Sequence, residues 1–178
     1  MKKKILIIVL AVIIAISIGI LFWSNMFRNA DEPLNSENAS NNNIASAQNL
    51  AEEFTLEDLS GNEISLSDFR GRKVFLNFWA TWCRACNLAM PYVNEIYREN
   101  HDIEIITINL REETGTIANY MERNNYEFRV LLDSNGRVGG LYRVNAVPFS
   151  VLIDEEGNIV NTRLGAMDRE QLIEFMGL

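Results

Sequence analysis

The segment from residue 74 to residue 108 constrains the fold more than any other part of the chain. Residues 74–79 (VFLNFW) form a near-continuous apolar run, which is typical of a strand buried on both faces of a mainly parallel sheet. Apolar residues then recur at steps of three and four, as on one face of a helix: Ala85, Leu88, Ala89, Val93, Ile96 and Tyr97. Residues 103–108 (IEIITI) are the next strand candidate. These three pieces predict a β-α-β unit with a right-handed crossover.

Further elements of the same α/β class follow. A helix is expected at 114–123 and a short strand at 128–132. Two strands flank the turn residues Glu155 to Asn158 and predict an antiparallel hairpin of 149–153 with 159–164. The C-terminal helix begins after Asp168, a capping residue with Gln171 as its capping-box partner. A short strand pair at 54–56 and 64–66 opens the domain, which we expect to span residues 50–178.

The N-terminal part of the chain has a different texture. Residues 5–23 form an uncharged run of nineteen residues, which at about 1.5 Å of rise per residue nearly spans a bilayer core of about 30 Å. Three lysines precede it, so the positive-inside rule places the domain outside the cytoplasm. A cleaved signal peptide is the alternative, but its apolar core is usually only about 7–15 residues long. We therefore expect a signal-anchor in residues 1–28 and a flexible polar linker in residues 29–49.

Charge and cysteine content exclude several classes of function. From residue 50 onward there are 12 basic and 21 acidic side chains, a net charge of −9 that repels nucleic acid. Two cysteines and one histidine cannot supply a four-ligand Cys/His zinc site. The histidine, His101, falls in a polar stretch where solvation is the ordinary expectation. The sequence thus predicts neither a nucleic-acid partner nor a metal site.

The two cysteines lie where the buried strand gives way to the helix, within Trp82-Cys83-Arg84-Ala85-Cys86. Unpaired N–H groups and the positive end of the helix dipole stabilise a thiolate there, so the pKa of Cys83 should be lowered, with Arg84 adding positive charge. Cys86 lies one helical turn on and can close a very small disulfide ring, which stabilises a fold only weakly. A reversible redox pair suits this spacing better: an exposed Cys83 sulfur attacks and Cys86 resolves.

Alternatives to the redox pair remain. A structural disulfide is one, and a copper or zinc site that uses His101 is another. Haem attachment would need a histidine after the second cysteine, where the chain has Asn87. Elsewhere, Val147-Pro148 precedes the inner strand 149–153, and proline at such an entrance indicates a special backbone geometry, for which a cis bond has a low prior from sequence alone.

The run from Asn77 to Cys86 (NFWATWCRAC), together with Met90-Pro91 and Val147-Pro148, resembles the thioredoxin superfamily, in particular the TlpA/ResA-like membrane-anchored thiol-disulfide oxidoreductases of bacteria. The resemblance implies a thioredoxin-like fold, a central mixed sheet flanked by helices, behind a single N-terminal transmembrane helix. It implies that Cys83 attacks, that Cys86 resolves, and that no cofactor is needed beyond their disulfide. It also implies an inserted helix and strand between about residues 114 and 132. Supporting roles fall to Trp82, Arg84, Val147 and Pro148.

The same resemblance implies a cis Pro148 beside the dithiol, with the Val147 backbone pairing with a substrate strand. The chain also departs from the family. Asn77 stands where plain thioredoxins have a buried Asp, and Ala89 stands where ResA-type members have a Glu. Glu112 matches an acidic residue of ResA-type members, although a solvated surface position is the expectation for it. The redox potential and the direction of electron flow therefore stay open.

The expected function is an extracytoplasmic, membrane-tethered protein thiol-disulfide oxidoreductase. As implied by the resemblance, it reduces protein disulfides, with apocytochrome c as the leading substrate and a sporulation or cell-envelope role as the second. A membrane thiol-electron donor of the CcdA/DsbD type would regenerate it. Two alternatives are an oxidase that introduces disulfides and a non-enzymatic envelope binding module with a structural disulfide. A peroxide-reducing enzyme is disfavoured, because no peroxidatic constellation surrounds Cys83.

Overall fold

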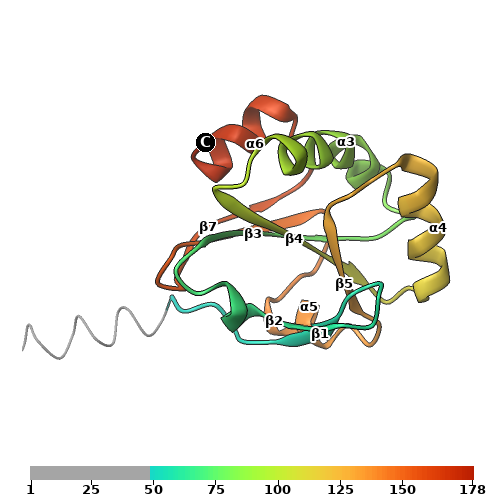
Figure 1. The fold of residues 1–178 in the computed structure, drawn as a ribbon, viewed down its shortest axis with the longest axis horizontal. Helices are drawn as coiled ribbons and strands as arrows, with labels where there is room; N and C mark the ends of the chain where they lie inside the picture. The colour runs from blue at the N-terminus through green and yellow to red at the C-terminus, as the bar shows by residue number, and fades with distance from the viewer. Residues whose placement is uncertain (1–48) are drawn as a thin grey trace, which may run out of the picture. The chain divides into compact units, whose positions relative to one another are not determined.

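A five-stranded sheet forms the centre of residues 49–178, the part of the chain that the computed structural model describes (Figure 1). Its strand order is β5-β4-β3-β6-β7. The first three strands of this order are mutually parallel, and β6 and β7 run antiparallel to their neighbours. The bounds are β3 Lys73–Trp79, β4 Ile103–Leu110, β5 Arg129–Asp133, β6 Phe149–Ile153 and β7 Ile159–Leu164. A separate antiparallel pair consists of β1 Thr55–Glu57 and β2 Glu63–Ser65.

Helices and the strand pair cover both faces of this sheet. On one face lie α3 (Arg84–Glu99) and α6 (Arg169–Met176), and α4 (Thr114–Asn124) packs into the same cluster (Figure 1). The other face is covered by β1, β2, a 3₁₀ turn at Leu66–Phe69 (η2) and the short α5 (Arg137–Leu141).

Strand β3 shows why its sequence is almost wholly apolar. Because successive side chains of a strand point to opposite faces, Phe75 and Trp79 join the cluster under α3, whereas Leu76 and Phe78 join the cluster under α5. All four residues are fully buried. A strand packed on both faces needs an apolar residue at nearly every position, as residues 74–79 have.

Most of the predicted elements are confirmed. The β-α-β unit, the β6–β7 hairpin, the Asp168–Gln171 capping box and the inserted α4 and β5 are all present. The opening strand pair is shifted by one residue at each strand, and β5 by one. The sequence analysis missed α5, because Gly139 and Gly140 are poor helix formers and give this segment no apolar period.

The first described residues are hydrogen-bonded to the β6–β7 hairpin. Ile159 N–H donates to the carbonyl oxygen of Asn49 at 2.7 Å, and Ala51 N–H donates to that of Gly157 at 2.9 Å. Since Val74 pairs with Ile153 and Phe78 with Phe149, this hairpin lies at the beginning of β3, away from the end that leads to the cysteines. The chain thus enters the domain at the end of the sheet opposite the cysteine pair.

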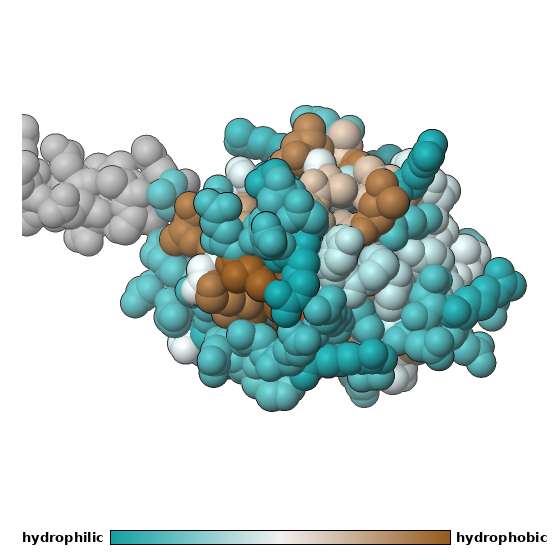
Figure 2. Space-filling model, turned by 90° about the horizontal axis from the view of Figure 1, so that it is seen from above, coloured by the Kyte–Doolittle hydropathy of each residue, from teal (hydrophilic) through white to brown (hydrophobic). Residues whose placement is uncertain are grey.

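The expected signal-anchor and most of the expected linker lie outside the described residues. Within residues 49–178, no helix is both long enough and apolar enough to cross a membrane. The surface shown in Figure 2 is mainly hydrophilic, with apolar residues confined to small groups. One ion-pair network on this domain joins α6 to α3: guanidinium nitrogens of Arg169 lie 2.7 Å from carboxylate oxygens of Glu95 and Glu99. Such exposed pairs add little stability.

Candidate active site

The cysteine pair lies at the start of α3, directly after β3. Cys83 is the N-cap residue of the helix, and its Sγ accepts the backbone N–H of Cys86 at 3.1 Å. A backbone donor and the positive end of the helix dipole both favour negative charge on this sulfur. The predicted position of Cys83 at a helix N-terminus is confirmed.

Cys83 and Cys86 form a disulfide, with their Cα atoms 5.2 Å apart. The prediction of an exposed attacking sulfur needs correction, because Cys83 is only 5% exposed and Cys86 is 0% exposed. The order of accessibility still favours Cys83. A substrate disulfide must therefore fit against the surface around Cys83 to reach its sulfur.

The peptide bond between Val147 and Pro148 is cis, as the resemblance implied. Cys83 Sγ lies 3.6 Å from the carbonyl oxygen of Val147. In the disulfide form no thiol hydrogen is present, so this is a contact. In the dithiol form the Cys83 thiol can donate to that oxygen. The structure thus brings Cys83 and Val147 together although 64 residues separate them in the chain.

The other two predicted residues border the disulfide without bonding to it. Trp82 is 73% exposed, which is unusual for a tryptophan and leaves its ring available to a partner. Arg84 is exposed, and its side chain forms no ion pair within the described residues.

Glu112, expected at a solvated surface position, is instead a hydrogen-bond acceptor for the segment before the cysteines. One carboxylate oxygen accepts the N–H of Thr81 at 2.7 Å and the side-chain amide of Asn109 at 2.8 Å. The other accepts the Thr81 hydroxyl at 2.5 Å. The carboxylate of Glu112 therefore fixes the backbone two residues before Cys83.

A second set of contacts supports the same segment from α4. The Tyr120 hydroxyl donates to Asn87 Oδ1 at 2.8 Å, and Asn87 Nδ2 donates to the carbonyl oxygen of Thr81 at 3.2 Å. Burial, with a smaller contribution from Tyr126, raises the pKa of Tyr120 to about 12. The Tyr120 hydroxyl consequently remains a donor even at pH values where an ordinary tyrosine ionises.

We expect Glu112→Gln to lower the free energy of unfolding by about 1–3 kcal/mol, because the NH2 group that replaces one carboxylate oxygen cannot accept a hydrogen bond from Thr81 or Asn109. Urea unfolding followed by circular dichroism measures the change. The matched control is Glu113→Gln at the next position, which is exposed and whose side chain makes no cap hydrogen bond. An equal loss in the two variants would contradict the assigned role.

The two positions that lack the usual acids are both buried. Asn77 is 4% exposed, and its Nδ2 donates to the Ser150 hydroxyl at 2.9 Å, whereas its Oδ1 has no protein partner. Ala89 is 5% exposed. An amide and a methyl group thus occupy the two places, and neither can take up a proton in the reaction.

Within residues 49–178, no three His, Cys, Asp or Glu side chains are arranged so that they could hold a metal ion. His101 is exposed, as expected from its polar surroundings.

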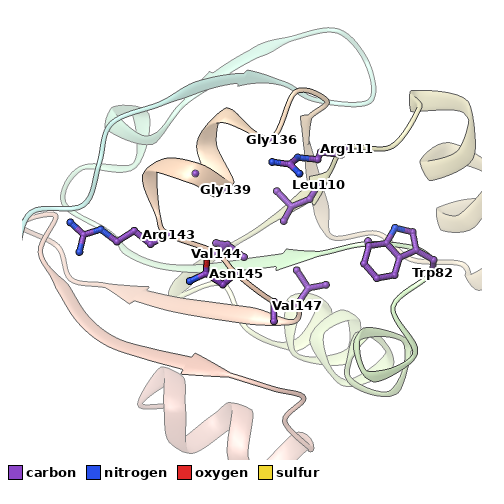
Figure 3. A pocket seen from close by; sticks show the side chains of 12 residues that line it. Trp82, Leu110, Arg111, Gly136, Gly139, Arg143, Val144, Asn145 and Val147 are labelled. Atoms are coloured by element: carbon purple, nitrogen blue, oxygen red, sulfur yellow. The ribbon is translucent and has the colours of Figure 1, made fainter.

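A groove of about 930 Å³ adjoins the cysteine pair, and the sequence analysis did not foresee it (Figure 3). Trp82 lies at one end of it, Val147 lies between Trp82 and Arg143, and α5 with the loop that follows supplies most of the remaining lining. Its residues come from three distant segments: Ala80, Trp82, Leu110, Arg111, Gly136, Gly139, Gly140, Arg143, Val144, Asn145, Ala146 and Val147.

A disulfide at the start of a helix, beside a cis-proline and just after the central strand of a mixed sheet, defines a protein of the thioredoxin-like class. Comparisons with solved structures agree. StoA from Bacillus subtilis aligns with a TM-score of 0.63 and 29% identity, covering 70% of this chain and 96% of StoA. The exposed lipoprotein thioredoxin Etrx1 from Streptococcus pneumoniae aligns with a TM-score of 0.65 and 29% identity, covering 71% and 98%.

Sequence relatives identify the family. The model of the AhpC/TSA family matches residues 47–162. Thiol-disulfide oxidoreductase ResA from Halalkalibacterium halodurans is 34% identical over 93% of this chain and 89% of its own length. ResA from Bacillus thuringiensis subsp. konkukian is 38% identical over 71% and 74%. The chain therefore belongs to the AhpC/TSA family and, within it, to the ResA-like thioredoxin-fold proteins, and it is a protein thiol-disulfide oxidoreductase.

Proposed function

We propose that this protein reduces disulfides of protein substrates on the outer side of the cell membrane. The observation that carries the proposal is the position of Cys83 Sγ, which accepts the Cys86 N–H at 3.1 Å and lies 3.6 Å from the Val147 carbonyl oxygen. This position offers a stabilised thiolate to a chain that lies against Val147.

The proposed reaction has two exchange steps. The Cys83 thiolate attacks one sulfur of the substrate disulfide, forming a mixed disulfide and releasing the first substrate thiolate. Cys86 then loses its proton and attacks Cys83 Sγ, which re-forms the Cys83–Cys86 disulfide and releases the second thiolate. The substrate gains two electrons, its two thiolates take up the proton lost by Cys86 and one proton from solvent, and the protein is left in the oxidised form.

Substrate positioning is assigned to Val147. Because β6 begins only at Phe149, the Val147 backbone lies outside the hydrogen-bonded part of the sheet. Val147 is also partly exposed. An extended substrate segment can pair with it as a short added strand, which would bring the target sulfur to Cys83. The exposed Trp82 ring borders the same space and would contact the substrate near its disulfide.

The location and the biological role rest on the sequence. The uncharged run of residues 5–23 and the lysines before it support a membrane anchor with the domain outside. The resemblance of the cysteine motif to TlpA/ResA-like proteins is the basis for proposing apocytochrome c as a substrate and a CcdA/DsbD-type membrane donor as the source of electrons. Both roles require a domain that stays near the membrane, accepts electrons from the membrane donor and passes them to the substrate.

The reduction potential of the Cys83–Cys86 pair tests the direction of electron flow. We expect a value nearer the approximately −270 mV of thioredoxin than the approximately −120 mV of the oxidant DsbA. Equilibration of the protein in dithiothreitol buffers of graded ratio, followed by alkylation of free thiols, measures it. A potential close to that of DsbA would support the alternative of a disulfide-introducing oxidase, which an over-stabilised Cys83 thiolate next to Arg84 would favour.

A further inference from the structure

The groove beside the cysteine pair differs in charge from the domain around it. Its lining contains two arginines, Arg111 and Arg143, and no acidic residue. The chain from residue 50 onward carries a net charge of −9. A positively charged groove on an acidic domain favours a negatively charged ligand.

The backbone around Arg111 directs its side chain along the groove lining. It follows β4 directly, has a left-handed backbone (φ 60°), and donates its N–H to the carbonyl oxygen of Asp133 at 3.0 Å. Its guanidinium lies against Gly136, where an added Cβ would overlap it, and Figure 3 shows this side chain directed toward Gly136. A residue without a side chain thus makes room for the guanidinium at this place.

The charge of Arg111 is not neutralised by an ion pair within residues 49–178. The neighbouring carboxylate, that of Glu112, is occupied by Thr81 and Asn109. The guanidinium therefore keeps its donors for a ligand, and a guanidinium binds a carboxylate through two parallel hydrogen bonds.

Arg143 lies toward the end of the groove away from Trp82, and Figure 3 shows its guanidinium pointing farther in the same direction. It also has a left-handed backbone (φ 53°), and it too forms no ion pair with another described residue. The two arginines thus occupy different positions along the groove, and Arg111 is nearer to Trp82 than Arg143 is (Figure 3).

We propose that this groove binds the segment of a protein substrate that flanks its disulfide and selects segments that carry Asp or Glu. Arg111 binds the carboxylate nearer the disulfide, and Arg143 attracts one farther along the segment. The inference rests on the proposed function for the position of the disulfide and adds the charge of the preferred substrate.

The test compares two synthetic peptides, each with one disulfide, whose flanking positions carry either Asp or Asn. We expect the reduced protein to react with the Asp peptide about threefold to tenfold faster at low ionic strength, the range that one or two exposed ion pairs provide. The preference should shrink as sodium chloride is added. Stopped-flow measurement of the second-order rate constants gives the ratio.

Variants assign the preference to the groove. Arg111→Gln should remove most of the preference, and Arg143→Gln should lower the ratio to a smaller extent. Arg123→Gln is the matched control, because Arg123 is exposed on α4, lies outside the groove and loses the same charge. A ratio near one in the unsubstituted protein, or an equal decrease in Arg123→Gln, would overturn the inference.

A binding measurement separates this inference from the proposed function. Versions of the two peptides with serine in place of cysteine cannot be reduced, and their affinity for the oxidised protein is measured by fluorescence anisotropy. Preferential binding of the Asp peptide, with most of the preference lost in Arg111→Gln, supports the groove even if neither disulfide peptide is reduced, in which case the proposed function fails alone. Equal binding of both peptides contradicts the inference.

Discussion

Cys83→Ser is expected to reduce insulin disulfides no faster than the added reductant alone. Serine keeps the size of the side chain but offers no thiolate to attack the substrate, and Cys86 is 0% exposed and cannot replace it. The turbidity of precipitating insulin B chain, followed with dithiothreitol as the electron source, measures the loss. Activity equal to that of the unsubstituted protein would favour the non-enzymatic binding module.

Cys86→Ser is the companion variant and should behave differently. Its Cys83 thiolate can still attack, but the mixed disulfide cannot be resolved from within the protein. We expect it to accumulate covalent complexes with disulfide-containing proteins, visible on non-reducing gels and lost on addition of dithiothreitol. If Cys86→Ser turns over insulin normally, Cys86 is not the resolving cysteine.

The second large effect concerns stability. We expect Trp79→Ala to lower the free energy of unfolding by about 3–5 kcal/mol, a large part of the roughly 5–15 kcal/mol of a typical domain. Trp79 is fully buried, its Nε1 donates to Thr107 Oγ1 at 3.1 Å, and its ring packs against Tyr120 and Phe128. Urea unfolding measures the difference. A variant too unstable to purify would indicate a loss of unfolding free energy even larger than expected.

Trp82→Ala provides the matched control. The same side chain is removed three residues along the chain, but Trp82 is 73% exposed, so its loss should change the free energy of unfolding by only about 0.5 kcal/mol or less. A comparable destabilisation in both variants would contradict the assignment of Trp79 to the core. Insulin reduction by Trp82→Ala should fall instead, because Trp82 borders the proposed substrate groove.

Local pattern was enough to predict the elements around the cysteines. Residues 74–79 form a short continuous apolar run of the length of a buried strand, the apolar stripe of α3 has the helical period, and Asp168 with Gln171 marks a helix start. The cis bond before Pro148 could not be derived in this way, because the local sequence gives only a low prior for it. The resemblance supplied it, and the structure confirms it.

Contacts between distant segments explain what the sequence did not reveal. Glu112 lies 31 residues from Thr81, and nothing in its own neighbourhood indicates that its oxygens accept from that residue. The groove likewise combines three segments, and one of them, α5, contains adjacent glycines that hide its helical character. The contact between Arg111 and Gly136 could not be predicted from the sequence, because neither residue forms part of a recognisable motif.

The hydrogen bonds of Asn49 and Ala51 to the β6–β7 hairpin have a practical consequence for orientation. They fix the incoming chain at the start of β3, so the seven residues of that strand, about 20 Å in length, separate it from the disulfide. A bead, sensor chip or fusion partner joined upstream of Asn49 would therefore leave the catalytic end facing the bulk solution. The domain can therefore be attached through its N-terminal side without blocking access to the disulfide.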